Sequence, residues 1–197
     1  MLKTIKKDDF TLRERNNMNL EGDWEWYQQF AGIEQSSNYY TNHIFSTIIN
    51  ENPLVQRIVE LGTYTGSMAI ALGLEGIRKG IEVQTFNIKE ETTAETQRIL
   101  NKLDVIRNIF DIFEQENIAK IKTLFDKPVY LLCDNGNKRA EFQLFVQHLK
   151  PGSVVSVHDY GVEFMPEDAQ AHRALLTPFH EEQWQNHNVQ LASWVVK

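Results

Sequence analysis

The sequence has little cysteine and no long hydrophobic run, and each shortage excludes a class of protein. Cys133 is the only cysteine among 197 residues, so the chain can form no internal disulfide, which is typical of a reducing environment. No apolar run approaches the roughly 18 residues needed to span a bilayer. The opening MLKTIKKDDF lacks the apolar centre of a signal peptide. We therefore expect a cytoplasmic protein without a membrane partner.

Positive charge is also scarce. The chain has 20 Lys and Arg against 27 Asp and Glu, which gives a formal net charge of -7. Such a balance repels polyanions unless the cations cluster on one face, and no basic strip with interleaved aromatic residues is visible. Nucleic acid is therefore not an expected partner. The length fits a single domain that buries about 70 % of its unfolded surface.

From residue 58 onward, short β-type runs alternate with segments of helical period. This alternation predicts an α/β fold, a doubly wound and mostly parallel Rossmann-like sheet with helices on both faces. The strands are expected at 58–61, 81–88, 105–110, 129–133, 153–157 and near 191–197. Within one domain of 1–197, we expect a helical N-terminal cap over 1–55, a core over 56–160 and a C-terminal segment over 161–197.

Several local patterns make finer predictions. Ile70, Leu74 and Ile77 have the spacing of one buried helix face, and Gly80 is a plausible end for that helix. Thr92 with Glu95 forms a capping box for the next helix. The acidic stretch 161–170 is expected to be mobile, and a helix-like segment around Trp184 should follow it. The aromatic residues of the N-terminal cap pack on the sheet or close over a ligand as a lid.

The stretch IVELGTYTGSMA, residues 58–69, joins a strand to a helix through two glycines. In a doubly wound sheet this is where ligands bind, beyond the carboxyl ends of the strands. A dinucleotide motif G-x-G-x-x-G would have glycine where Tyr64 stands, and no G-x-x-x-x-G-K-[ST] is present. The turn can therefore hold a ligand, but its pattern does not favour a phosphate.

An acid followed by Gly62 and Gly66 in this context resembles the S-adenosylmethionine loop of class I methyltransferases. The sequence ELGTYTG is more similar still to that of the cation-dependent O-methyltransferases, such as the catechol and caffeoyl-coenzyme A enzymes. The resemblance continues at LLCDNGNK and LKPGSVVSVHDY, so it covers roughly residues 55–160. There it is similar to the small-molecule and sugar O-methyltransferases with a His-Asp pair after the fifth strand.

The resemblance implies a set of cofactor-binding residues. The methionine part of S-adenosylmethionine would be wrapped by Gly62, Thr63, Tyr64, Gly66 and Ser67. Glu60 would help to hold its ammonium group, although Glu60 could instead merely cap the turn.

Two further cofactor positions are less regular. Asn87 stands where these enzymes carry a ribose-binding acid, and the loss of a carboxylate predicts weaker binding, with Glu90 as an alternative contact. Asp111 is placed near the adenine amino group, or else it caps a helix with Glu114. Asp134 is expected beside the cofactor and at a metal.

Asp134 and Asp159 end two strands that should be neighbours in the sheet. Paired carboxylates suit a divalent cation, Mg or Mn, which makes a hydroxyl easier to deprotonate. The resemblance implies that both acids are metal ligands; otherwise Asp134 caps a helix and Asp159 starts a turn. His158 is a third ligand or the general base. Lys138 resembles the catalytic lysine of the catechol-type enzymes with a one-residue difference in spacing, or is a surface lysine.

The leading hypothesis is an S-adenosylmethionine-dependent O-methyltransferase that acts on a small-molecule hydroxyl with the help of a divalent cation. Two alternatives share the fold: a regulatory protein that binds the cofactor without catalysis, and a metal-dependent enzyme that does not transfer methyl groups. The sequence does not identify the methyl acceptor. The N-terminal aromatic residues also allow a homodimer.

Overall fold

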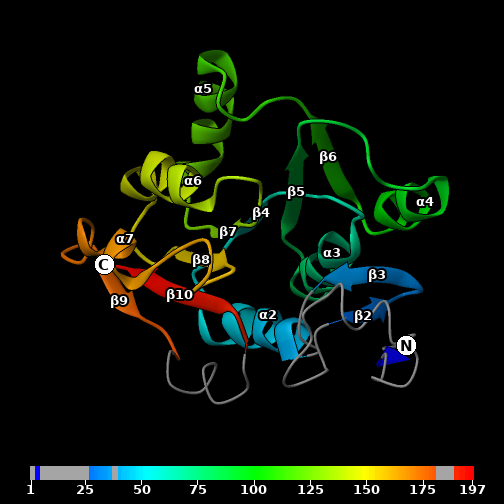
Figure 1. The fold of residues 1–197 in the computed structure, drawn as a ribbon, viewed down its shortest axis with the longest axis horizontal. Helices are drawn as coiled ribbons and strands as arrows, with labels where there is room; N and C mark the ends of the chain where they lie inside the picture. Colours follow the sequence, from blue (N-terminus) through cyan, green and yellow to red (C-terminus); the bar gives the residue numbers. More distant parts are fainter. Residues whose placement is uncertain (1–2, 5–26, 37–39, 181–188) are drawn as a thin grey trace.

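A seven-stranded sheet forms the centre of the protein. The computed structural model describes residues 3–4, 27–36, 40–180 and 189–197, and Figure 1 shows their arrangement. The strand order is β6-β5-β4-β7-β8-β10-β9. These strands are β4 (Arg57–Leu61), β5 (Glu82–Asn87), β6 (Val105–Ile109), β7 (Tyr130–Cys133), β8 (Val154–His158), β9 (Leu176–Pro178) and β10 (Leu191–Val196).

The direction of the strands confirms the predicted doubly wound topology. Strands β6, β5, β4, β7 and β8 are parallel, whereas β10 runs antiparallel to both β8 and β9. The chain winds from β4 outward to β5 and β6, and then crosses to β7 and β8 on the other side. The order therefore reverses beside β4, and the carboxyl end of β4 is the expected ligand position.

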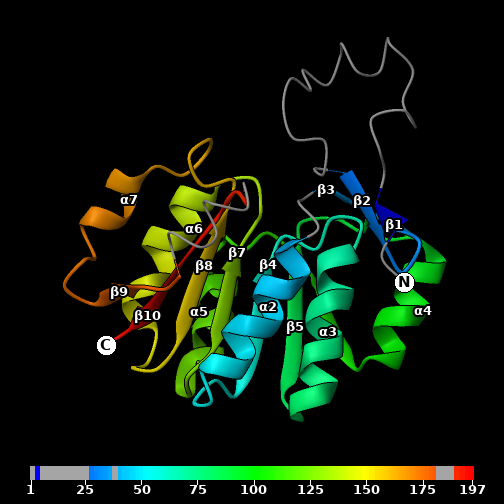
Figure 2. The same cartoon turned by 90° about the horizontal axis from the view of Figure 1, so that it is seen from below.

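Helices cover both faces of the sheet (Figure 2). One apolar core lies under α2 (Tyr40–Glu51), α3 (Ser67–Lys79) and α4 (Ala94–Lys102). The other lies under α5 (Gln115–Thr123), α6 (Lys138–Phe145) and α7 (Pro166–Gln170). Short 3-10 turns, η2 (Leu124–Asp126) and η3 (Val146–His148), continue α5 and α6. No helix in the described part of the chain is long and apolar enough to cross a membrane.

Helix α3 buries a different face from the predicted one. Ile70 is buried, but Leu74 and Ile77 are 46 % and 55 % exposed. The buried side instead includes Gly76, where a Cβ atom would lie 2.3 Å from Val83 Cγ2. Because glycine lets the helix approach β5 closely, the side of α3 that carries Gly76 is buried, together with Ile70 and Leu72, and Leu74 and Ile77 lie on the outer side. Gly80 ends the helix in the left-handed conformation, as predicted.

The cap of α4 lies one residue later than predicted. The side chain of Thr93 accepts a hydrogen bond from the Thr96 backbone N–H at 3.1 Å, so Thr93 is the N-cap. Thr92 instead donates its hydroxyl proton to Glu90. Both threonines can accept a backbone hydrogen bond, so their sequence alone does not choose between them.

Among the described residues of the N-terminal cap, only α2 is helical. Strands β2 (Tyr27–Phe30) and β3 (Ile33–Ser36) form an antiparallel hairpin, with β1 (Lys3–Thr4) beside β2. The hairpin turn places both Ala31 and Gly32 at positive φ, 53° and 81°, which matches the twist of paired strands. Phe45 of α2 is fully buried, so it packs on the sheet. Trp24, Trp26 and Tyr39 lie outside the described residues.

The segment after β8 is packed rather than loose. Phe164 is fully buried among aromatic side chains, and α7 follows it. Asp168 of α7 forms an ion pair with Arg139 of α6. The expectation of a mobile acidic stretch is therefore wrong, because one aromatic residue anchors it in the core. The segment around Trp184 lies outside the described residues.

Candidate functional site

The turn after β4 requires glycine at two positions and tolerates a tyrosine between them. Gly62 has φ of 109°, and a Cβ atom there would lie 2.3 Å from the Asp134 carbonyl oxygen. Gly66 has φ of 89°, and its Cβ would lie 2.7 Å from Thr96 Cγ2. Between them, Tyr64 also has positive φ, but its side chain is 57 % exposed. Both glycines are required by close approach, whereas the tyrosine projects outward.

A cavity of about 200 Å³ opens where this turn meets the ends of β7 and β8. Its described lining residues are Gly62, Thr63, Tyr64, Thr65, Ser67, Met68, Asp134, His158 and Asp159. The structure thus brings the predicted glycine-turn residues and the predicted acid-histidine group to one cavity. Thr65 and Met68 also line it, although the motif did not single them out.

Asp134, His158 and Asp159 form the polar end of the cavity. One potential ligand atom from each lies within 4.8 Å of the others. His158 Nδ1 is 3.1 Å from Asp134 Oδ1 and 3.3 Å from Asp159 Oδ1. The convergence follows from topology, because β7 and β8 are parallel neighbours whose carboxyl ends share one edge. Asp159 adopts φ of 55°, a conformation that aspartate tolerates better than most residues.

The two carboxylates control the ionisation of His158. Burial by itself would lower the pKa of His158, but the negative charge and hydrogen bonds of Asp134 and Asp159 raise it to about 10. Burial opposes ionisation of Asp159 too, yet His158 and Lys138 lower the pKa of that carboxyl. A protonated imidazole neither binds a cation nor accepts a proton. Either predicted role of His158 therefore requires the loss of that proton.

Lys138 is a buried charge and not a surface lysine. Its Nζ lies 2.9 Å from Asp159 Oδ2, 2.9 Å from Glu163 Oε2 and 3.8 Å from Asp134 Oδ1. It also donates a hydrogen bond to the carbonyl oxygen of Asn135 at 3.1 Å. Burial opposes its charge, but these acids raise the pKa of Lys138. The ammonium group therefore supplies positive charge between the carboxylates.

Glu141 shapes the turn that carries Asp134. Its buried carboxylate accepts the backbone N–H groups of Asn135 and Asn137 at 3.3 Å and 3.2 Å. Burial raises the pKa of Glu141 to about 7. A carboxylate that binds the N–H groups of two residues in the turn fixes the loop, and Asp134 with it. No spacing motif predicted this role.

Glu60 lies behind the cavity wall rather than in it. The residue is fully buried, and its Oε2 accepts the hydroxyl proton of Thr85 at 2.5 Å. Its Oε1 has no hydrogen-bond partner among the described residues. Burial, with a smaller effect of Asp134, raises the pKa of Glu60 to about 8. Among the described residues, the Glu60 side chain is bonded to Thr85 of β5 and not to the turn, so these contacts do not support a capping role.

Glu60 should impose a measurable pH dependence on stability. Its pKa is about 8 in the folded protein against 4.5 for the ordinary group, so between these values the folded state binds more protons. Stability due to this residue therefore falls as pH rises through that window. In urea unfolding, the free energy of unfolding of Glu60→Gln should rise relative to that of wild type by up to about 1.4 kcal/mol per pH unit within this window. Parallel pH profiles for the two proteins would contradict the raised pKa.

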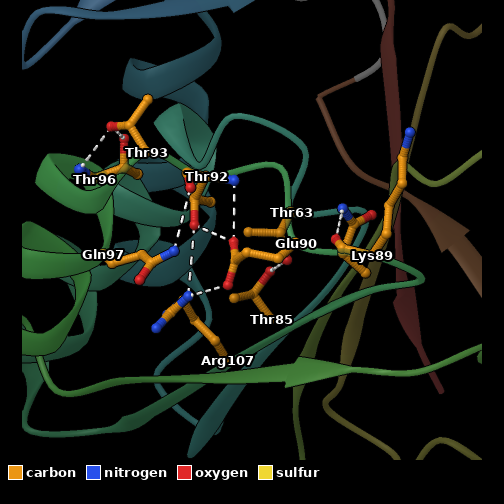
Figure 3. A network of polar contacts seen from close by, with 10 residues as sticks. Thr63, Thr85, Lys89, Glu90, Thr92, Thr93, Thr96, Gln97 and Arg107 are labelled. Atoms are coloured by element: carbon orange, nitrogen blue, oxygen red, sulfur yellow. Dashed lines mark hydrogen bonds and ion pairs between the residues drawn. The ribbon is translucent and has the colours of Figure 1, made fainter.

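Asn87 makes local contacts after β5. Its amide donates hydrogen bonds to the carbonyl oxygen of Lys89 at 2.8 Å and to Glu91 Oε2 at 3.0 Å. Glu90, the alternative ribose contact, accepts from the backbone N–H of Thr92 at 3.0 Å and pairs with Arg107 at 2.6 Å (Figure 3). Neither residue is among the described lining of the cavity. Their predicted roles at the ribose stay predictions.

Asp111 follows β6 and organises the turn into α5. Its Oδ1 accepts the backbone N–H of Phe113 at 2.9 Å, and its carbonyl oxygen accepts the Asn117 side-chain amide at 2.9 Å. Glu114 is the N-cap residue of the helix. These contacts favour the local, capping interpretation of Asp111. It is not among the described residues that line the cavity.

The residues present fit both groups that the motifs imply. An orphaned carboxylate oxygen behind the glycine turn suits a ligand with hydrogen-bond donors. Two carboxylates and one imidazole at the other end are a hard donor set with one nitrogen, which suits Mg or Mn.

Comparison with known proteins agrees with this geometry. No protein-family model matches the sequence, and no curated protein matches it by sequence. Among solved structures, the apo form of CmcI-N160 shares 18 % identity with a TM-score of 0.64, over 98 % of this chain and 88 % of that one. CmcI-D160 with Mg and SAM shares 17 % identity with a TM-score of 0.63, over 98 % and 89 %.

A third similar structure is the O-methyltransferase TomG from Streptomyces achromogenes, in complex with SAM. It shares 14 % identity with a TM-score of 0.52, over 79 % of each chain. Since the sequence identities are low, these similarities concern the fold. The chain has the fold of class I S-adenosylmethionine-dependent O-methyltransferases.

Proposed function

We propose that the protein is an S-adenosylmethionine-dependent O-methyltransferase that acts on a small-molecule hydroxyl and uses a divalent cation. One observation carries the proposal: the glycine turn and the Asp134–His158–Asp159 group line the same cavity. A methyl donor at the turn would then lie beside a hydroxyl held at the acids. The similarity to the fold of CmcI, solved with Mg and SAM, supports it.

On the donor side, the turn supplies backbone and hydroxyl groups. Gly62 keeps the chain close to β7, which leaves the cavity open beside Thr63 and Ser67. Glu60 lies behind the wall, where a ligand with a positive end would favour its ionised form. In the reaction the carbon–sulfur bond of the sulfonium breaks and a carbon–oxygen bond forms, which leaves a neutral thioether.

On the acceptor side, Asp134 and Asp159 would hold the cation, with His158 as a third ligand once it is neutral. A bound divalent cation lowers the pKa of a hydroxyl that it contacts. Lys138 places a positive charge 2.9 Å from Asp159, so the lysine and the cation would share the negative charge of that carboxylate. The hydroxyl proton must leave the oxygen before or during methyl transfer; in the alternative role, where His158 is not a ligand, its neutral imidazole would accept that proton.

Calorimetric titration with S-adenosylmethionine, with and without Mg or Mn, tests the proposal first. We expect saturable binding of the methyl donor to the purified protein. A methyl-transfer assay on a panel of catechol-like diols and sugars should then show turnover that chelation abolishes and added Mg or Mn restores. Failure to bind the methyl donor under any of these conditions would reject the proposal.

A cofactor-binding protein without catalytic activity is the second candidate. It is favoured by Asn87, whose amide is used on Lys89 and Glu91 where an acid would bind the ribose. This candidate predicts donor binding without methyl transfer to any acceptor. Retention of a metal without donor binding would instead indicate a metal-dependent enzyme of another class.

A further inference from the structure

A chain of buried hydroxyl groups connects Glu60 to the cavity wall. Thr85 on β5 is fully buried, and its Oγ1 lies 2.5 Å from Glu60 Oε2 and 2.5 Å from Thr63 Oγ1. Figure 3 shows the contact between Thr63 and Thr85. Glu60 and Thr85 are directly paired in the register of β4 and β5. Thr63 is 5 % exposed and lines the cavity, whereas Thr85 does not.

The direction of these hydrogen bonds follows from the supply of protons. Thr85 has one hydroxyl proton, and it donates that proton to Glu60 Oε2. Thr85 can therefore only accept a hydrogen bond from Thr63. Thr63 donates its single hydroxyl proton to that contact. What the Thr63 hydroxyl still offers to a ligand is lone pairs. This direction belongs to the ionised state of Glu60, the state that a bound ammonium group favours, because a proton on Oε2 would instead be donated to Thr85.

We propose that Thr85 is a positioning residue that fixes the Thr63 hydroxyl as a hydrogen-bond acceptor, so that the ligand group bound there is a donor such as an ammonium group. The inference rests on the proposed function, because S-adenosylmethionine carries an ammonium group. Thr85, which lies outside the cavity, would thus determine that the subsite at Thr63 accepts hydrogen bonds. A ligand with only acceptors at this end, such as a phosphate, is disfavoured.

The charges around Glu60 give the proposal a second readout. The titratable groups that face Glu60 are Asp134 and Tyr130, both from β7 or its end. Burial raises the pKa of Glu60 to about 8, so it is largely protonated at neutral pH without a ligand. An ammonium group nearby favours the ionised form. Binding of the methyl donor should therefore release protons, up to about one per site.

Thr85→Val removes the hydroxyl and keeps the side-chain shape, and Thr85→Ser keeps the hydroxyl. We measure the Kd for S-adenosylmethionine by calorimetry in buffers of different ionisation enthalpy, which also gives the proton release. Thr85→Val should weaken binding about tenfold or more, as expected for a hydrogen bond to a charged group, and should change the proton release. Thr85→Ser should bind within about threefold of wild type.

The control is Thr41→Val, which removes another fully buried hydroxyl, one that has no hydrogen-bond partner among the described residues. The Kd of this variant for S-adenosylmethionine should equal that of wild type. A second test uses Thr63→Val: if Thr85 acts through Thr63, the change Thr85→Val should cost less in that background than in wild type. The single variant Thr63→Val keeps the proposal testable if Thr85→Val folds poorly: it leaves the Glu60–Thr85 contact intact, and it should weaken binding of S-adenosylmethionine by about the same factor.

The possible outcomes separate the two claims. If wild type does not bind S-adenosylmethionine, the proposed function fails. If wild type binds it, and a folded Thr85→Val protein binds it within twofold with the same proton release, the role of Thr85 is overturned. If Thr85→Val weakens binding of S-adenosylmethionine as much in the Thr63→Val background as in wild type, Thr85 does not act through Thr63.

Discussion

Asp159→Asn should reduce methyl transfer by at least about a hundredfold, because charge stabilisation by a bound cation is worth several kcal/mol and each 1.4 kcal/mol is about tenfold in rate. The change removes negative charge where Asp159 meets both His158 and Lys138. Asparagine tolerates the positive φ of this position, so the backbone should be kept. Turnover and the Kd for Mg or Mn are the quantities to measure.

Asp126→Asn is the matched control. It makes the same chemical change on an acid that pairs with Arg57 at 3.0 Å and is not among the described residues that line the cavity. Its turnover should stay within about twofold of wild type. If Asp159→Asn kept wild-type turnover and cation affinity, the acidic group would not be a metal centre for this reaction.

Gly62→Ala should destabilise the fold by about 3 kcal/mol or more. Part of the loss comes from positive φ, which costs an alanine about 1–3 kcal/mol. The rest comes from the Cβ atom, which would lie 2.3 Å from the carbonyl oxygen of Asp134 and 2.7 Å from the nitrogen of Asn135. These are backbone atoms that cannot rotate away. Any relaxation moves the loop of Asp134, so binding at the cavity should fall as well.

Gly80→Ala separates the two causes. Gly80 also has positive φ, 68°, but a Cβ atom there would have no neighbour within 4 Å. We expect a loss of about 1 kcal/mol in urea unfolding, from backbone strain alone. Equal losses for the two variants would show that the close approach between the turn and β7 is not rigid.

Strands β4 to β8 and β10 could be predicted because each carries a local signal, whereas β9 and the strands of the N-terminal cap were not expected. β7 is apolar throughout, and Asp134 and Asp159 follow two such strands, so their convergence at one edge is a consequence of parallel neighbours. The glycine turn was equally clear, since two glycines around a tight connection have few other uses. These features depend on short stretches of chain and on one topological rule.

What escaped prediction depends on contacts between distant elements. The spacing of Ile70, Leu74 and Ile77 is helical, but the glycine side of α3 is the side that approaches the sheet. Thr85 is an ordinary strand residue until the register of β4 and β5 pairs it with Glu60. The pairing of a buried acid on one strand with a hydroxyl on the next follows from the register and not from the spacing of either residue.

Strand β10 lies between β8 and β9, so β9 has β10 as its pairing partner although it precedes β10 in the chain. During synthesis on the ribosome, β9 emerges before the strand that it needs. Until β10 arrives, the backbone N–H and C=O groups on the edge of β8 that β10 will pair have no strand partner, which leaves an open edge for association with other molecules.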